Sequence, residues 1–328
     1  MKLRSRDGAR ASVGLVIAGV VLGSCTVSGP GAPSAIMSGS TPRPTHGATA
    51  SVPLVGKIVG EFDAGGDGWA MTKAGGALWI QVDPPVDAIV RIDVATGVAV
   101  PAIPGGIEAK FGKEGLWVAC CDGIARVDPA TGEQLLLVPL DGAFALANGS
   151  VFTLSKQGLQ ELDPQTGVAV GEPVAVDPTA CDAWKDLIVA FGSAWLACKQ
   201  GKVVRIDLEG GRSTSITTQA GAHTFAVTED AVWVTNYQAG SVSRIDPQTD
   251  QVTTIEGAGS GVGITSGGGF VWAAAANGIA KIDPATRSIV AMIDLGPGDY
   301  YELVWDEGII WVSTRGSRVL KVDPSATP

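Results

Sequence analysis

The feature that most constrains the fold of this chain is a repeat with a period near 40 residues. One copy runs from Val232 to Ile255. It reads as an apolar strand centred on Trp233, a polar turn, a strand that ends at Asp246, a Pro-containing turn and a further strand. A single unit of this size cannot bury both of its apolar faces, so neighbouring copies must stack on one another.

Two sequence markers give the same number of copies. The first is the aromatic residue of each apolar triplet, with spacings of 38, 35, 43, 38, 39 and 39 residues: Trp79, Trp117, Phe152, Trp195, Trp233, Trp272 and Trp311. The second is a charged–apolar–Asp triplet after each aromatic, which ends at Asp93, Asp128, Asp163, Asp207, Asp246, Asp283 and Asp323. A short apolar segment precedes each aromatic and adds a strand. The pattern predicts an all-β fold, a seven-bladed β-propeller of four-stranded blades.

Asp-Pro-x-Thr sequences recur at 128–131, 163–166, 246–249 and 283–286. The Asp side chain caps a turn and Pro presets φ at the next position, so these sequences suit turns between third and fourth strands. A metal-binding role is less favoured, because a residue that recurs from blade to blade serves the blade.

The two ends of the repeat region predict how the ring closes. The chain finishes on the third strand of the seventh blade, at 319–323, and residues 57–65 align with 288–296, a fourth strand. We therefore expect an N-terminal strand at about residues 55–62 to complete the last blade, which would remove the exposed edges of an open array.

The first 24 residues have the layout of a secretory signal peptide: four basic residues before Ala11, then a 13-residue apolar run, too short to span a bilayer. Leu22 to Cys25 resembles the lipobox of bacterial lipoproteins. The resemblance implies cleavage before Cys25, acylation of its sulfur, and attachment to the extracytoplasmic face of a bacterial cell membrane. An ordinary signal peptide with an incidental cysteine is the alternative.

Residues 25–53 follow as a Gly/Pro/Ser/Thr-rich stretch with Arg43 as its one charged side chain, which predicts a disordered tether. The predicted propeller covers 54–328. The chain carries a net charge of −10, and without the basic leader it is more acidic still. This excludes a basic nucleic-acid footprint. We expect a monomer whose only membrane contact is the lipid.

Export permits disulfides among the four domain cysteines. Cys120 and Cys198 occupy the same position in blades two and four, too far apart to pair, whereas Cys181 and Cys198 fall on one face of blade four. We expect a Cys181–Cys198 disulfide. Cys120 and Cys121 form either a vicinal disulfide or two thiols.

Function should lie where the repeats differ, because the fold alone does not assign it. Loops that enter the first strands and loops that join second to third strands surround one mouth of a propeller channel. In blades four, five and seven these loops carry most of the polar and aromatic residues, and the longest spacing adds the loop 177–186. The candidate ligand-binding residues are Trp184, Lys185, Lys199, His223, Asn236, Tyr237, Asp299, Tyr300, Tyr301 and Arg315. A solvated rim without a ligand is the alternative.

The Trp-Val strands and the Arg-Ile-Asp-Pro turns, as at 244–247, resemble the YVTN and NHL-type propellers and the virginiamycin B lyase family. The lyase resemblance implies a magnesium-dependent elimination that opens a cyclic depsipeptide, with histidine and glutamate at the mouth. The match departs here, because His223 is the only histidine of residues 54–328. His223 is the candidate catalytic residue, and Asp182 and Asp299 are candidate metal ligands, in that reading alone.

Other enzyme classes lack their motifs: the sequence contains no Gly-x-Ser-x-Gly elbow and no Walker loop. A quinone-dependent dehydrogenase is disfavoured because its repeat signature is missing. We therefore expect a non-catalytic, cofactor-free binding module for a protein partner or a small ligand at the channel rim. A metal-assisted lyase or hydrolase and a purely structural envelope protein are the alternatives.

Overall fold

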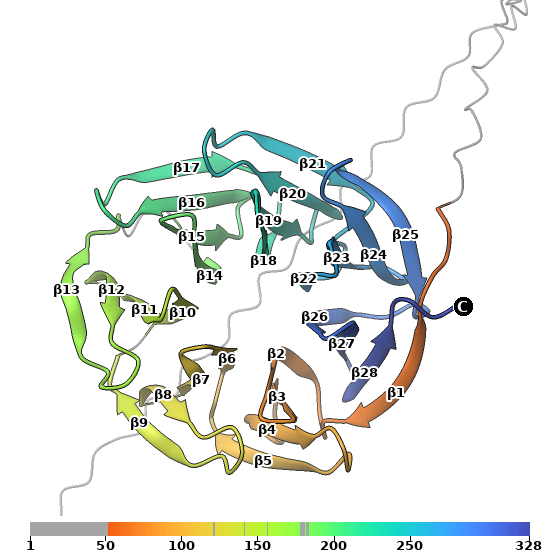
Figure 1. Cartoon of the computed structure of the whole chain (residues 1–328), viewed down its shortest axis with the longest axis horizontal. Helices are drawn as coiled ribbons and strands as arrows, with labels where there is room; N and C mark the ends of the chain where they lie inside the picture. The colour runs from red at the N-terminus through yellow and green to blue at the C-terminus, as the bar shows by residue number, and fades with distance from the viewer. Residues whose placement is uncertain (1–51, 121, 141, 156, 178–180, 182–183) are drawn as a thin grey trace, which may run out of the picture. The chain divides into compact units, whose positions relative to one another are not determined.

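The structure is a computed structural model that describes residues 52–328, apart from 121, 141, 156, 178–180 and 182–183. Residues 50–328 form one compact unit. The described residues build seven separate four-stranded antiparallel sheets, which are arranged around a ring like blades (Figure 1). The predicted fold, blade number and strand number are confirmed.

The blades follow the chain in order, with the innermost strand first. Blade one comprises β2 (Gly68–Ala74), β3 (Ala77–Val82), β4 (Ala88–Asp93) and β5 (Ala99–Pro104). Blade two comprises β6 (Glu108–Gly112), β7 (Gly115–Cys120), β8 (Gly123–Val127) and β9 (Gln134–Val138). Blade three comprises β10 (Ala143–Ala147), β11 (Ser150–Ser155), β12 (Gly158–Leu162) and β13 (Ala169–Val174). Blade four comprises β14 (Trp184–Ala190), β15 (Ser193–Cys198), β16 (Lys202–Asp207) and β17 (Ser213–Thr217).

The remaining blades repeat this order. Blade five comprises β18 (Ala222–Thr228), β19 (Ala231–Asn236), β20 (Ser241–Ile245) and β21 (Val252–Glu256). Blade six comprises β22 (Ile264–Gly267), β23 (Phe270–Ala275), β24 (Gly278–Asp283) and β25 (Ser288–Asp294). Blade seven comprises β26 (Tyr300–Asp306), β27 (Ile309–Thr314), β28 (Arg318–Asp323) and, from the other end of the chain, β1 (Lys57–Asp63).

Strand β1 closes the ring. It pairs antiparallel with β28 from Lys57↔Asp323 to Asp63↔Arg318, and the Phe62 ring lies 5.6 Å from that of Trp311. The segment before β1 also contacts blade six, where the Val55 amide donates to the Met292 carbonyl at 2.8 Å. The first residues of the compact unit thus hold two blades together, and the expected N-terminal closing strand is present.

The two sequence markers turn out to be one structural pair. In every blade the marker aromatic of the second strand lies directly opposite the charged residue of the third strand, as in Trp195↔Arg205 and Phe152↔Glu161. Several of these cations lie over the indole, with the Arg205 guanidinium 5.3 Å from the Trp195 centroid. The cation lies over the face of a fully buried tryptophan, so the two markers form one contact and share one period.

The recurring aspartates serve the turns between third and fourth strands, as expected. Asp246 Oδ1 accepts hydrogen bonds from the amides of Gln248 (2.9 Å) and Thr249 (3.0 Å), and Asp163 makes the equivalent pair with Gln165 and Thr166. These N–H donors lower the pKa of the Asp246 carboxyl. The hydrogen bonds account for the aspartates without a metal ion.

Candidate functional site

A cavity of about 950 Å³ occupies the centre of the ring. Its walls come from the innermost strands β2, β6, β10, β14, β18, β22 and β26, which surround the centre in Figure 1. We call the end where these strands begin, together with the loops joining second to third strands, the first mouth. The opposite end is the second mouth.

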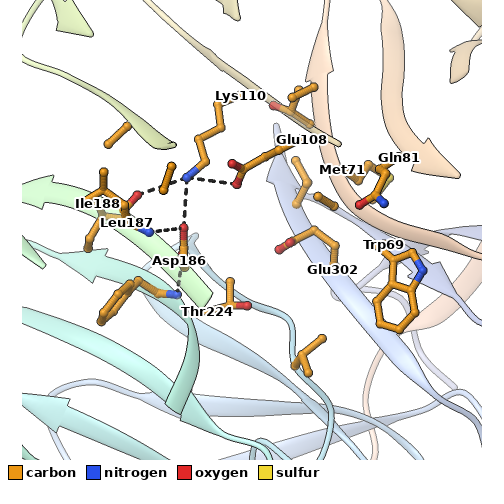
Figure 2. Close-up of a pocket in the computed structure, with 18 of the residues that line it drawn as sticks. Trp69, Met71, Gln81, Glu108, Lys110, Asp186, Leu187, Ile188, Thr224 and Glu302 are labelled. Carbon is orange, nitrogen blue, oxygen red and sulfur yellow. Dashed lines mark hydrogen bonds and ion pairs between the residues drawn. The ribbon is translucent and has the colours of Figure 1, made fainter. Parts of the chain in front are cut away.

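A partly buried ionic cluster lies inside the first mouth, and Figure 2 shows it around one ammonium group. Lys110 Nζ on β6 lies 3.2 Å from Glu108 on the same strand and 3.0 Å from Asp186 on β14. Lys110 also donates to the Leu187 carbonyl at 3.1 Å. The lysine therefore reaches past blade three, where the small side chains of Ala143 and Ala145 line the wall.

Asp186 joins three blades at this cluster. Besides Lys110 of blade two, it accepts hydrogen bonds from its neighbour Leu187 (2.8 Å) in blade four and from the Phe225 amide (3.2 Å) of blade five. The cluster thus fixes the relative positions of blades two, four and five around the cavity.

Burial and charge shift the pKa values of this cluster in a consistent way. Burial alone would lower the pKa of the Lys110 ammonium, but the charges of Asp186 and Glu108 outweigh it and raise the pKa. Burial raises the pKa of Glu108, and the Lys110 charge offsets part of that rise. Lys110 is therefore firmly charged and already neutralised by two carboxylates.

Glu302 on β26 faces the same space from blade seven. Its carboxylate accepts a hydrogen bond from the Leu303 amide at 3.2 Å, and in Figure 2 it points toward the cluster without an ion pair to Lys110. Burial, followed by the negative charge of Asp186, raises the pKa of Glu302 well above its usual value. A carboxylate with a raised pKa that points into a cavity is a common feature of functional sites.

The raised pKa of Glu302 predicts a pH-dependent stability. The folded protein keeps this proton at pH values where the unfolded chain has released it, so Glu302 adds stability at low pH that is lost as the pH rises through its folded pKa. Above about pH 5 the free energy of unfolding should fall with pH, and Glu302→Gln should remove that slope and stabilise the protein by about 1–2 kcal/mol near pH 8.

Urea denaturation of both proteins at several pH values measures this difference. The matched control is Glu307→Gln, which removes an exposed carboxylate five residues further along the chain and should leave the slope due to Glu302 in place. A wild-type and a Glu302→Gln curve that run parallel from pH 5 to 8 would contradict the assignment, since about 1.4 kcal/mol accompanies each unit of pKa shift.

A stacked aromatic pair lies at the first mouth between blades one and seven. The rings of Trp69 on β2 and Tyr301 on β26 have centroids 4.1 Å apart and an interplanar angle of 20°. The Trp69 indole N–H donates to the Asp83 carboxylate, and the Trp69 backbone carbonyl accepts from the Ser313 hydroxyl at 3.0 Å. Trp69 is 37% exposed despite these bonds, so a pre-ordered aromatic surface faces solvent at the opening of the cavity.

Carboxylates surround this aromatic pair. Burial, followed by the charge of Asp299, raises the pKa of the Tyr301 hydroxyl. Arg315 bridges two of the acids, with Nη1 3.5 Å from Asp299 and Nε 3.8 Å from Asp67. The exposed guanidinium is held loosely at these distances, so it leaves the acidic character of the rim largely in place.

His223 lies at the same mouth on blade five and lines the cavity. Its Nδ1 lies 3.0 Å from the Thr224 hydroxyl, and its ring meets Tyr237 edge to face at 5.6 Å. The structure therefore brings together Tyr301, His223, Tyr237, Asp299 and Arg315 of the expected set at one end of the channel.

Other expected residues lie elsewhere. Asn236 is fully buried, with its amide 3.1 Å and 2.9 Å from the hydroxyls of Ser241 and Ser243. Tyr300 is also buried, and its hydroxyl donates to the Gly296 carbonyl at 2.7 Å. Both act in the blade interior, which removes them from the ligand-contact candidates. Lys199, by contrast, is exposed in the loop between β15 and β16, at the first mouth.

The remaining residues predicted from the sequence lie in or next to the loop before blade four. Asp182 falls outside the described residues, whereas Trp184 and Lys185 begin strand β14, with Trp184 opposite Cys198. Cys121 also falls outside them, so its relation to Cys120 stays a prediction. Within the described part of the chain, no three His, Cys, Asp or Glu side chains gather into a set that could hold a metal ion.

The Cys181–Cys198 disulfide is present, with Cα atoms 5.5 Å apart. It ties the loop before β14 to the end of β15 and closes a sequence separation of 17 residues. Changing both cysteines to serine should lower the free energy of unfolding by about 2–4 kcal/mol, because the cross-link restricts the unfolded chain.

Denaturant unfolding with and without dithiothreitol checks this prediction. The reductant should destabilise the wild-type protein to the level of the double variant and leave the double variant unchanged. A wild-type free energy of unfolding that dithiothreitol leaves unchanged, although both thiols become accessible to a labelling reagent, would contradict the stabilising role of the disulfide.

The ionic cluster and Trp69 were not among the residues chosen from the sequence. The pattern did hold a signal, because Glu108, Asp186 and Glu302 each stand nine residues before a marker aromatic, one place after the expected mouth position. In the part of the chain that the structure describes, no helix has the length and apolar character to span a bilayer.

Comparison with known proteins places the fold but not the activity. The sequence matches no protein-family model and no curated protein. Among solved structures it resembles virginiamycin B lyase from Staphylococcus aureus, with 15% identity, a TM-score of 0.64 and coverage of 82% of this chain and 99% of the lyase.

Two further structures give the same result. A catalytically inactive histidine-to-alanine variant of that lyase with quinupristin matches at 14% identity and a TM-score of 0.63, covering 82% of this chain and 99% of the variant. BamB from Moraxella catarrhalis matches at 14% identity and a TM-score of 0.54, covering 78% of this chain and 84% of BamB. At such identities the likeness establishes a lyase-like β-propeller fold.

Proposed function

We propose that this chain is an exported, lipid-anchored β-propeller that acts as a non-catalytic binding module for a small ligand in the first mouth. The observation that carries the proposal is the Trp69–Tyr301 stack, which is held in place at the opening of the cavity and remains partly exposed. An ordered aromatic ring that stays partly exposed to solvent is typical of a surface that contacts a ligand.

The size and lining of the cavity favour a small ligand over a protein segment. Its volume of about 950 Å³ lies in the range of small-molecule sites. Apolar wall residues such as Met71, Ile188 and Val262 combine with a few polar groups at defined positions, a mixture that orients a ligand within an apolar pocket.

Attachment to the outer face of a cell membrane agrees with the disulfide. Cys181–Cys198 requires an oxidising compartment, which an exported protein reaches. Acylation of Cys25 would then hold the propeller at the membrane, and more than one acyl chain would make the attachment stable.

Equilibrium dialysis of the full-length protein against a small-molecule extract of its host tests the binding function. Mass spectrometry of the retained compounds should reveal a species that Trp69→Ala and Tyr301→Ala lose. The matched control is Phe191→Ala, an exposed aromatic in the turn between β14 and β15. Retention of the same compounds by all variants would contradict a site at the first mouth, and retention of no compound by the wild-type protein would contradict the small-ligand function.

A lyase activity is the second candidate, favoured by the fold likeness and by His223 at the first mouth. The described residues do not assemble a magnesium site, and Asp299 faces the Arg315 guanidinium. Incubation with quinupristin and Mg²⁺, followed by liquid chromatography, tests this candidate. A linearised product that His223→Ala abolishes would replace the binding function, and intact quinupristin would remove this lyase reading.

A further inference from the structure

We propose that the ligand of the first mouth is an organic cation with an exposed ammonium group. The inference rests on the proposed binding function and names the chemical class of its ligand. It is carried by three features of the same cavity: the balance of charge on its wall, the engagement of its lysine, and the position of the aromatic pair.

The balance of charge on the wall is negative. Among the described residues that line the cavity, the carboxylates of Asp83, Glu108, Asp186 and Glu302 stand against the ammonium of Lys110. The wall also carries apolar side chains such as Met71, Ile188 and Val262, which screen these charges less than water does. A positive ligand would therefore be stabilised throughout the cavity.

Lys110 offers little to an anionic ligand. Its ammonium already contacts Glu108 at 3.2 Å, Asp186 at 3.0 Å and the Leu187 carbonyl at 3.1 Å. An ammonium has three N–H donors, and three acceptors surround this one. An anion would have to displace a carboxylate and would meet the remaining acids at short range.

Glu302 is the carboxylate best placed for a cation. It points toward the centre of the cavity in Figure 2, and its hydrogen bond in the protein comes from the Leu303 amide. The groups that face it are Asp186 of blade four and Lys110 and Glu108 of blade two. The net negative surroundings of Glu302 are relieved when a positive group enters.

The aromatic pair is tied to Glu302 through one side chain. The Ser313 hydroxyl donates to the Trp69 carbonyl and accepts from the Glu302 amide, both at 3.0 Å, and Tyr301 precedes Glu302 in the chain. Indole and phenol faces attract a cation through their negative π-surface. The aromatic surface and the carboxylate thus form one site. The aromatic rings would contact the apolar groups attached to the ammonium nitrogen of a ligand, and the Glu302 carboxylate would pair with its charge.

The rim supports this assignment. Asp67 and Asp299 flank Arg315, so two carboxylates stand against one guanidinium and the charge of this group is negative. An exposed arginine at 3.5–3.8 Å from its partners is easily displaced by a second cation.

Isothermal titration of the full-length protein with choline and with its neutral isostere 3,3-dimethylbutan-1-ol tests the inference. The two probes share a shape and differ in charge, so choline should bind at least about tenfold more tightly. Glu302→Gln should weaken choline binding about tenfold and leave the neutral alcohol unchanged. The matched control is Asp306→Asn on the same strand, which removes a carboxylate that pairs with Lys73 outside the cavity wall.

A readout without a variant keeps the test decisive if Glu302→Gln fails to fold. Choline does not titrate, so its affinity for the wild-type protein should rise with pH as Glu302 loses its proton, at pH values well above the usual 4.5 of a glutamate. His223 also lines the cavity, so the same titration is run with Glu302→Gln, which should show a smaller rise with pH than the wild-type protein if it folds.

Equal affinities for choline and the alcohol would overturn the cation and leave the binding function intact. Absence of choline binding below about 10 mM would also overturn it. The dialysis experiment then judges the binding function separately, because its readout does not depend on the charge of the ligand.

Discussion

Deleting residues 54–63 should abolish the cooperative fold, the largest loss expected of any change here. The deletion removes β1, so β28 keeps its pairing with β27 but loses its outer antiparallel partner over its whole length, and Trp311 loses Phe62. It also removes the Val55 contact with Met292 in blade six. The ring would then be open at blade seven, with an unpaired apolar edge that invites aggregation.

Size-exclusion chromatography and near-ultraviolet circular dichroism measure the outcome. The truncated chain should elute as aggregate or lack fixed tryptophan signals. The loss of free energy of unfolding caused by the deletion should exceed the roughly 5–15 kcal/mol that stabilises a typical protein. The control deletion of residues 26–49, outside the compact unit, should leave both measurements unchanged. A monomeric truncate with native tryptophan signals would contradict the closure of the ring by β1.

Lys110→Met should lower the free energy of unfolding by about 1–3 kcal/mol, because it removes the one cation that two partly buried carboxylates share. Both Glu108 and Asp186 lose their cation, and the Asp186 side chain is only 13% exposed. The methionine fills most of the volume of the lysine, so the cost reports charge more than packing. The link between blades two and four is lost as well.

The matched control is Lys73→Met, which removes a lysine of the same exposure from a single ion pair with Asp306. This change should cost about 1 kcal/mol or less, as is usual for a single partly exposed pair. Chemical denaturation of the three proteins provides the comparison. Equal losses for the two variants would show that water in the cavity solvates the cluster and that it does not brace the blades.

The blade architecture was predictable because every repeat carries the same two sequence markers. The pairs Trp195↔Arg205 and Trp233↔Arg244 occupy the same register in their blades, so a single-chain reading finds their period without an alignment. The Cys181–Cys198 disulfide was predictable for a related reason, since the blade pattern places both cysteines on one side of blade four.

The wall of the cavity was harder to predict because the innermost strands start irregularly. Bulges shift the register near the beginning of β2, β14, β18 and β26, and a shift of one residue moves side chains to the other face. Tyr301 and Glu302 show the result. They are neighbours in the sequence within the bulge of β26, yet both line the cavity.

Periodicity alone gives the positions of the acidic residues but not the contacts of the ionic cluster. Its members Glu108, Lys110, Asp186 and Glu302 come from blades two, four and seven, and each type of charge occurs at its position in some blades but not in others. Only the closure of the ring brings these residues together, so a contact between Lys110 and Asp186, 76 residues apart, requires the structure.

Native mass spectrometry of the full-length protein purified from its own host tests the central claim most directly. The mass under native conditions should exceed the mass of the same sample after denaturation by that of one small molecule, and Trp69→Ala should lose the difference. The denatured mass should further exceed that of the chain from Cys25 onward by the acyl groups. Identical native and denatured masses for the wild-type protein, saturated with host extract, would contradict a ligand site at the first mouth.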